Sequence, residues 1–290
     1  MIRSLKQIET LVRKAKDEAY SQMKAPLTPA FSGPVRWPVK CTVGPGLEGA
    51  IACESRVGYV NGSQGALIYR GHDVFDLCAY SSFEEVSYLL IHGELPTRKE
   101  LDVFKERLVR YRYVPATLRQ LMSFPIEQMN AMAALRMGTT LMRQEFTVLD
   151  KEAGRRDVGQ AIGTDEDSIA METMPTGNPH AVYEFEGAYL HKHMTAVEEA
   201  EERATGLRTC YHLLAGVATL AAATARLRRG FMPLDPDPEL GHAANYLYMM
   251  TGRRPTPIEE RIMDIALILH AIVLAGVLVH FSVHCLMGDG

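Results

Sequence analysis

Histidines gather with acidic residues in the middle of the chain, where they could be imagined to hold a metal ion. The group comprises His180, Glu184, Glu186, His191 and His193. Imidazole and carboxylate are both metal ligands. However, two histidines separated by one residue point to different faces of a helix. We therefore interpret this group as solvated or packing side chains.

A second group lies near the C-terminus, where His280, His284 and Cys285 share one face of an expected helix. Three candidate ligands in a terminal run could hold a soft metal ion, but incidental polar residues are the simpler interpretation. No serine or cysteine lies in a nucleophile elbow or a comparable setting. The sequence thus predicts neither a metal site nor an identified catalytic residue in these groups.

Gly44, Gly46 and Gly49 have the spacing of a dinucleotide-binding loop, GxGxxG. That motif requires a preceding strand and a following helix, because the helix N-terminus holds the pyrophosphate. No strand pattern precedes these glycines, and Pro45 interrupts them. We interpret them as a glycine-rich turn and expect no cofactor.

The composition is that of an ordinary globular chain: 290 residues, 47% hydrophobic and 23% charged, with a net charge of -4. Basic residues are dispersed, so no positive stripe could neutralise nucleic-acid phosphates, and we exclude a nucleic-acid partner. The five cysteines include no CxxC pair, which suits a reduced compartment. We expect a cytoplasmic location.

The pattern of elements predicts a mainly helical fold with one small hairpin. Residues 1–40 form an amphipathic helix followed by a proline-rich connector, and residues 56–60 and 66–70 flank an Asn-Gly turn typical of a hairpin. Helices then begin at capping boxes, Ser82 with Glu85, Thr97 with Glu100 and Thr256 with Glu259. Residues 150–180 are polar and acidic, and indicate a surface loop.

Two stretches are more apolar than a surface helix permits. Residues 195–229 are interrupted at Gly206, and the part after it is apolar on nearly every side, which predicts burial inside the domain or in a subunit interface. Residues 265–287 are long enough to raise a membrane span. His270, His280 and His284 are costly in lipid, so we favour a buried helix and keep a tail anchor as the alternative.

Several ordered blocks between residues 41 and 271 resemble the citrate synthase family. Residues 46–77, with Tyr69-Arg70-Gly71, resemble its opening hairpin, and residues 81–108, with Gly-Glu-Leu-Pro-Thr, resemble its next two helices. The later blocks are Phe124-Pro125, Met132 with Leu135-Arg136, Asn245 to Gly252, and Ala266 to Ala271. One departure is that the usual His-Pro-Met is here Asn130-Ala131-Met132.

This resemblance implies a large, mainly helical domain, incomplete here, that pairs into a homodimer through buried helices. We divide the chain into residues 1–40, a family-like large-domain fragment at 41–271, and a divergent hydrophobic tail at 272–290. The family condenses acetyl-CoA with oxaloacetate to give citrate and CoA in the tricarboxylic acid cycle. Such chemistry needs a carboxylate base, two histidines and arginines that hold carboxylates.

The resemblance ends within a motif. In the family Leu-His-Ala is followed by Asp-His-Gly, whereas here Ala271 leads into Ile-Val-Leu-Ala-Gly, so the oxaloacetate-binding histidine is absent. Only His270 remains, as a residue of the site wall. We expect an acyltransferase family member that is inactive alone, with an aberrant end. The alternatives are a dimerising or regulatory subunit that pairs with a full-length synthase, and a tail-anchored membrane protein.

Overall fold

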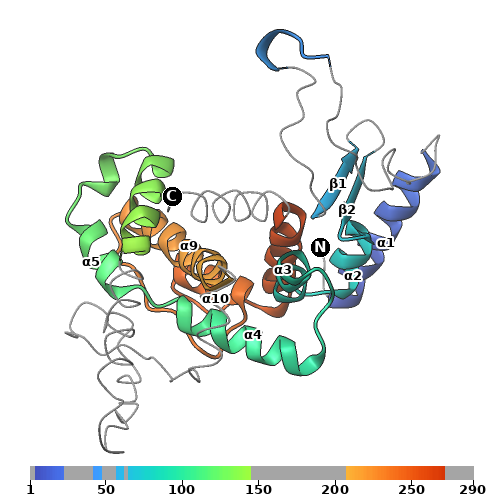
Figure 1. The fold of residues 1–290 in the computed structure, drawn as a ribbon. Helices are drawn as coiled ribbons and strands as arrows, with labels where there is room; N and C mark the ends of the chain where they lie inside the picture. The colour runs from blue at the N-terminus through green and yellow to red at the C-terminus, as the bar shows by residue number, and fades with distance from the viewer. Residues whose placement is uncertain (1–3, 23–41, 48–56, 62–64, 145–206, 272–290) are drawn as a thin grey trace, which may run out of the picture. The chain divides into compact units, whose positions relative to one another are not determined.

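The structure is a computed structural model in which two compact units are formed by residues 1–97 with 265–277 and by residues 98–264 with 278–290. Figure 1 shows the helices and strands of these units, coloured from blue at the N-terminus to red at the C-terminus. The domain boundaries expected near residues 40 and 271 stay a prediction. The structure describes residues 4–22, 42–47, 57–61, 65–144 and 207–271.

The first unit contains a small antiparallel sheet in the order β1-β2-β3. Strand β1 (Gly58–Asn61) pairs with β2 (Ala66–Tyr69), which confirms the predicted hairpin. A third strand, β3 (His72–Asp73), follows after a turn of only two residues. The sequence reading missed β3 because two residues are too short to show the alternation by which strands are recognised.

Three helices pack around this sheet. The capping box of Ser82 and Glu85 is present at α3 (Phe83–His92), which ends at left-handed Gly93 as predicted. Helix α2 (Val74–Tyr80) is capped by Asp73. The predicted N-terminal helix is α1 (Leu5–Ser21), which contacts α2 through the ion pair of Lys16 with Asp76 and the edge-to-face rings of Tyr20 and Phe75.

The GxGxxG spacing lies only partly within the described residues. Residues Pro45–Leu47 form a single 3₁₀ turn, η1, in which Gly46 has a φ of 71°. Residue 47 is the last described residue of this segment, so Gly49 lies outside the described residues. The described part thus shows a turn at Gly46, and the absence of a dinucleotide site stays a prediction.

The second unit is built around α9 (Leu207–Leu227), which contacts α4 (Arg98–Tyr111), α5 (Pro115–Met122), η2 (Ile126–Gln128) and α10 (His242–Thr251). Further helical segments cover residues 131–144 and 257–271, the latter shared by both units. Buried side chains of α9 include Tyr211, Leu214, Leu220 and Ala223. The predicted burial of this apolar helix is confirmed.

Among the described residues, α9 is also the one helix long and apolar enough to cross a membrane. However, 67% of its most apolar window is buried within the protein, as in the core helix of a soluble fold. Residues 195–206 and 272–287, which belong to the two apolar stretches of the sequence, lie outside the described residues.

Helix α9 and the helix at 131–144 approach closely because glycine lies at the crossing. A Cβ atom added at Gly216 would lie 2.2 Å from Met142 Sδ, a distance at which one of the two must shift. The Met142 side chain is fully buried, so any shift would move it against other core side chains. Gly138 is less tightly constrained, since its added Cβ would meet Leu220 at 3.4 Å.

Replacing Gly216 with alanine is expected to lower the free energy of unfolding by about 1–3 kcal/mol, because overpacking outweighs the gain in helix propensity. Denaturant unfolding of the single variants and of Gly216→Ala/Met142→Ala measures this. Shortening Met142 should make the double loss smaller than the sum of the two single losses. Gly138→Ala is the matched control and should be near neutral. Additive losses would contradict the crossing contact.

Candidate site at the end of the 257–271 helix

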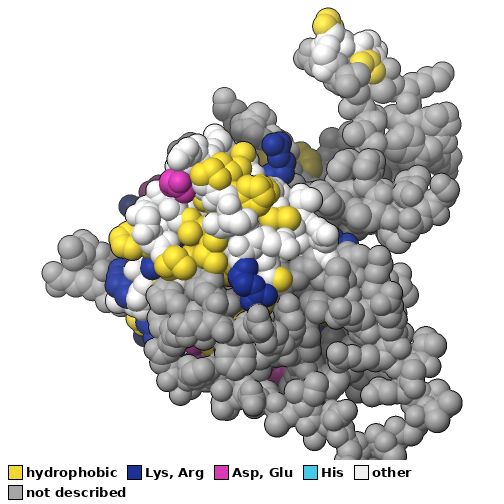
Figure 2. Space-filling view, turned by 90° about the vertical axis from the view of Figure 1, so that its left-hand side faces the viewer, with side chains coloured by type: hydrophobic (Ala, Val, Ile, Leu, Met, Phe, Trp, Pro, Cys, Tyr) yellow, Lys and Arg dark blue, Asp and Glu magenta, His cyan; other side chains and the backbone are white. Residues whose placement is uncertain are grey.

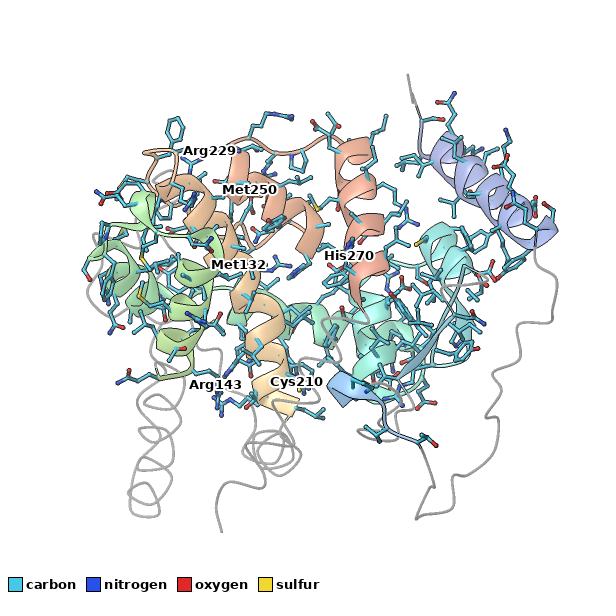
Figure 3. All side chains as sticks on the ribbon, turned by 90° about the horizontal axis from the view of Figure 1, so that it is seen from above. Met132, Arg143, Cys210, Arg229, Met250 and His270 are labelled. Carbon is cyan, nitrogen blue, oxygen red and sulfur yellow. The ribbon has the colours of Figure 1, made fainter. Side chains whose placement is uncertain are left out.

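His270, the one site residue predicted with a location in the described part, lies near the end of the helix at 257–271 (Figure 3). This helix begins at a capping box, as predicted: Thr256 N donates to Glu259 Oε2 at 2.8 Å, and Glu259 N donates to Thr256 Oγ1 at 3.4 Å. The hydrogen bonds from Arg253, and then those from Thr256, lower the pKa of Glu259 to about 2. The start of the helix is thus fixed by local sequence.

The imidazole of His270 is exposed and directed at its own helix. Its Nδ1 lies 2.8 Å from the carbonyl oxygen of Ala266, one turn earlier. A carbonyl oxygen can only accept, so Nδ1 is the donor in this contact, and Nε2 is the ring nitrogen that the contact does not use. On the same turn Ile268 and Ala271 are buried. The His270 side chain is therefore open to solvent while its buried neighbours hold the backbone, and its place in a site wall stays a prediction.

Tyr69, at the end of β2, contacts this turn from within the same unit. Its hydroxyl donates to the carbonyl oxygens of Ile268 at 3.0 Å and Leu269 at 3.1 Å. The Tyr69 side chain is completely buried. The hydrogen bonds connect residues 199 and 200 positions apart, so sequence periodicity could not have revealed them.

A second polar cluster, which the sequence reading did not find, lies inside the unit of residues 98–264. Arg112 is 2% exposed and donates from Nη1 to the carbonyl oxygen of Leu240 at 2.7 Å. Thr219 of α9 donates to the carbonyl oxygen of Arg112 at 2.8 Å. His242, at the start of α10, is fully buried beside the guanidinium, and burial, followed by the charge of Arg112, lowers its pKa to about 3.

The loop that precedes α10 is held by the same region. Asp237 N donates to Asn245 Oδ1 at 2.8 Å, and the guanidinium of Arg254 pairs with Asp237 at 2.6 Å and Glu239 at 2.7 Å. The partners of these side chains, like those of Arg112, include backbone groups that fix the path of the loop. This cluster therefore connects Arg112, the residue after α4, to α9 and to the loop before α10. The only hint of it in the sequence was the Asn245 to Gly252 block.

The other histidine groups singled out in the sequence are not assembled in the described part of the chain. Those residues, at 180–193 and at 280–285, lie outside it. Within the described ranges, no group of three His, Cys, Asp or Glu side chains is placed to hold a metal ion. His270 is the single predicted site residue that the structure places.

Comparison with known proteins gives the class of protein to which this fold belongs. The family model described as "Citrate synthase, C-terminal domain" matches residues 46–271. The citrate synthase of Haloferax volcanii is 30% identical over 226 residues, 78% of this chain and 48% of that protein. "Citrate synthase 2" of Bacillus subtilis is 34% identical over 227 residues, 78% of this chain and 47% of that protein.

A solved structure agrees with the sequence comparison. The citrate synthase of Pyrobaculum aerophilum has a TM-score of 0.57 and 28% identity, and the match covers 83% of this chain and 51% of that one. The chain belongs to the citrate synthase family. It spans about half the length of the curated relatives it matches.

The buried His242 makes the stability of the fold dependent on pH. Its pKa is about 3 when folded and 6.5 when unfolded, so the unfolded chain takes up the proton first as the pH falls. The stabilisation is complete above pH 6.5 and is lost progressively toward pH 3, by at most about 5 kcal/mol. Denaturant unfolding between pH 7.5 and 4 measures it.

The variant His242→Gln is the control, because glutamine keeps a polar side chain of similar size but does not titrate. The difference in unfolding free energy between the two proteins should change as the pH falls below 6.5. A constant difference across that range would show that His242 is not held neutral inside the fold.

Proposed function

We propose that this chain provides the helical scaffold of a citrate synthase and does not by itself condense acetyl-CoA with oxaloacetate. The observation that carries the proposal is the change of sequence after Ala271. In place of the family's Asp-His-Gly, this chain has Ile272 to Gly276. The family match likewise ends at residue 271.

The chemistry of the family reaction explains why this change matters. Carbon–carbon bond formation needs a base that removes a proton from the thioester methyl group, and groups that stabilise the enolate and polarise the ketone. The remaining candidate, His270, is an exposed imidazole bonded to Ala266 of its own helix. One such group can line a site, but it cannot perform all three tasks.

Self-association is the second part of the proposal, and an exposed apolar surface supports it. Figure 2 shows hydrophobic side chains gathered on one face of the described surface. In the unit of residues 98–264, the exposed large apolar side chains include Phe124, Met132, Phe231 and Met232. Arg228 donates to the carbonyl oxygen of Met129, which brings the loop after α9 close to the start of the helix at 131–144. Contiguous exposed apolar patches favour association.

The assignment extends to a cytoplasmic homodimer in which α9 and its neighbours form the core of each subunit. Cys78 and Cys210 are free cysteines, in keeping with a reduced compartment. Pairing with a full-length synthase instead of a second copy would be the regulatory form of the same association.

The first test is oxaloacetate-dependent release of CoA thiol from acetyl-CoA by the purified chain, with propionyl-CoA in a parallel reaction. We expect no release above the rate without protein, and no difference between the chain and its His270→Ala variant. The Bacillus subtilis citrate synthase 2 is the positive control. Oxaloacetate-dependent release that His270→Ala abolishes would overturn the proposed inactivity.

The association is tested with Phe231→Asp, which places a charge at a side chain that is 57% exposed. The expected result is at least a tenfold weaker self-association in sedimentation velocity, because a charge at an apolar contact must be desolvated. Val103→Asp on α4, 44% exposed, is the matched control and should leave association unchanged. Equal behaviour of the two variants would remove the Phe231 region from the interface.

A further inference from the structure

The β2–β3 turn is held in a conformation that few residues adopt. It consists of Arg70 and Gly71, with φ values of 48° and 88°, between the paired residues Tyr69 and His72. Positive φ at both central residues is the mark of a type I′ hairpin turn, which matches the twist of the strands. Glycine adopts such angles freely, whereas arginine does so at a cost.

A hydrogen bond at the end of α3 offsets this cost. Arg70 Nη2 donates to the carbonyl oxygen of Leu90 at 3.0 Å. The carbonyl groups in the last turn of a helix have no partner within the helix, so an arginine is a favourable donor there. Gly93, where α3 ends, lies beside the guanidinium, since an added Cβ would be 4.0 Å from Arg70 Cζ.

Tyr69, immediately before Arg70, holds a different helix. Its buried hydroxyl donates to the backbone at Ile268 and Leu269, directly before His270. Both acceptors are main-chain atoms, so the contact fixes the position of the helix backbone rather than one side chain. Arg70 therefore holds the end of α3, and Tyr69 holds the end of the 257–271 helix.

We propose that Tyr69 is the positioning residue for His270. The imidazole follows the backbone of its own turn, because Nδ1 is bonded to Ala266 and the turn is held at Ile268 and Leu269. This role rests on the proposed function only in that His270 borders the site of the family fold.

The test is Tyr69→Phe, which keeps the aromatic ring and removes the hydroxyl. Hydrogen exchange of the amides at residues 265–271 should accelerate about three- to tenfold, the loss expected for one hydrogen bond. The imidazole proton signals of His270 should shift in the NMR spectrum, while exchange within α9 stays unchanged. Tyr80→Phe, at a tyrosine with 63% exposure in α2, is the control and should alter neither signal.

Arg70→Gly separates the two anchors of the turn. It relieves the positive φ and removes the bond to Leu90, so exchange should accelerate at the end of α3 while the His270 signals hold. The positioning role would be overturned if amide exchange at residues 265–271 were unchanged in Tyr69→Phe. It would also be overturned if exchange within α9 accelerated as much as exchange at residues 265–271. Hydrogen exchange and the NMR signals of His270 do not depend on catalysis. Thiol release by the chain would therefore refute the proposed inactivity but would not test the role of Tyr69.

Discussion

Burial of α9 is the constraint on which the second unit depends. A helix that is apolar on nearly every side must be covered by several others, and α4, α5 and α10 provide that cover. The neighbouring helices must approach α9 closely to cover it. At Gly216 the missing side chain leaves room for Met142. The polar residue Thr219 sits on the same helix, where it is satisfied by the backbone of Arg112. The buried hydroxyl of Thr219 therefore links α9 to the backbone that follows α4 through a hydrogen bond.

The parts of the fold that depend on neighbouring residues could be predicted from the sequence. The boxes of Ser82 with Glu85 and of Thr256 with Glu259 link residues three positions apart, and both are present. The hairpin of β1 and β2 follows from two short apolar runs around a turn. In each case the partners lie within a few residues, so their types and spacing are enough to specify the structure.

The long-range contacts of the candidate site and of the separate Arg112 cluster could not be predicted in this way. Tyr69 reaches Ile268 across 199 residues, and Arg112 reaches Leu240 across 128. Both acceptors are backbone carbonyls, which every residue carries, so no pairing of side-chain types indicates them. His270 was predicted only through the resemblance of its motif to a family. Its imidazole contacts Ala266, one turn earlier in the same helix, which is a local contact.

These long-range contacts explain how scaffold and chemistry can separate in this family fold. The backbone around His270 is held by the hydrogen bonds of Tyr69 and by the burial of Ile268 and Ala271. These interactions involve no residue after Ala271, so a chain can keep them while the sequence directly after Ala271 changes. Because folding and catalysis impose separate demands on neighbouring positions, family membership establishes the scaffold here, and activity has to be measured.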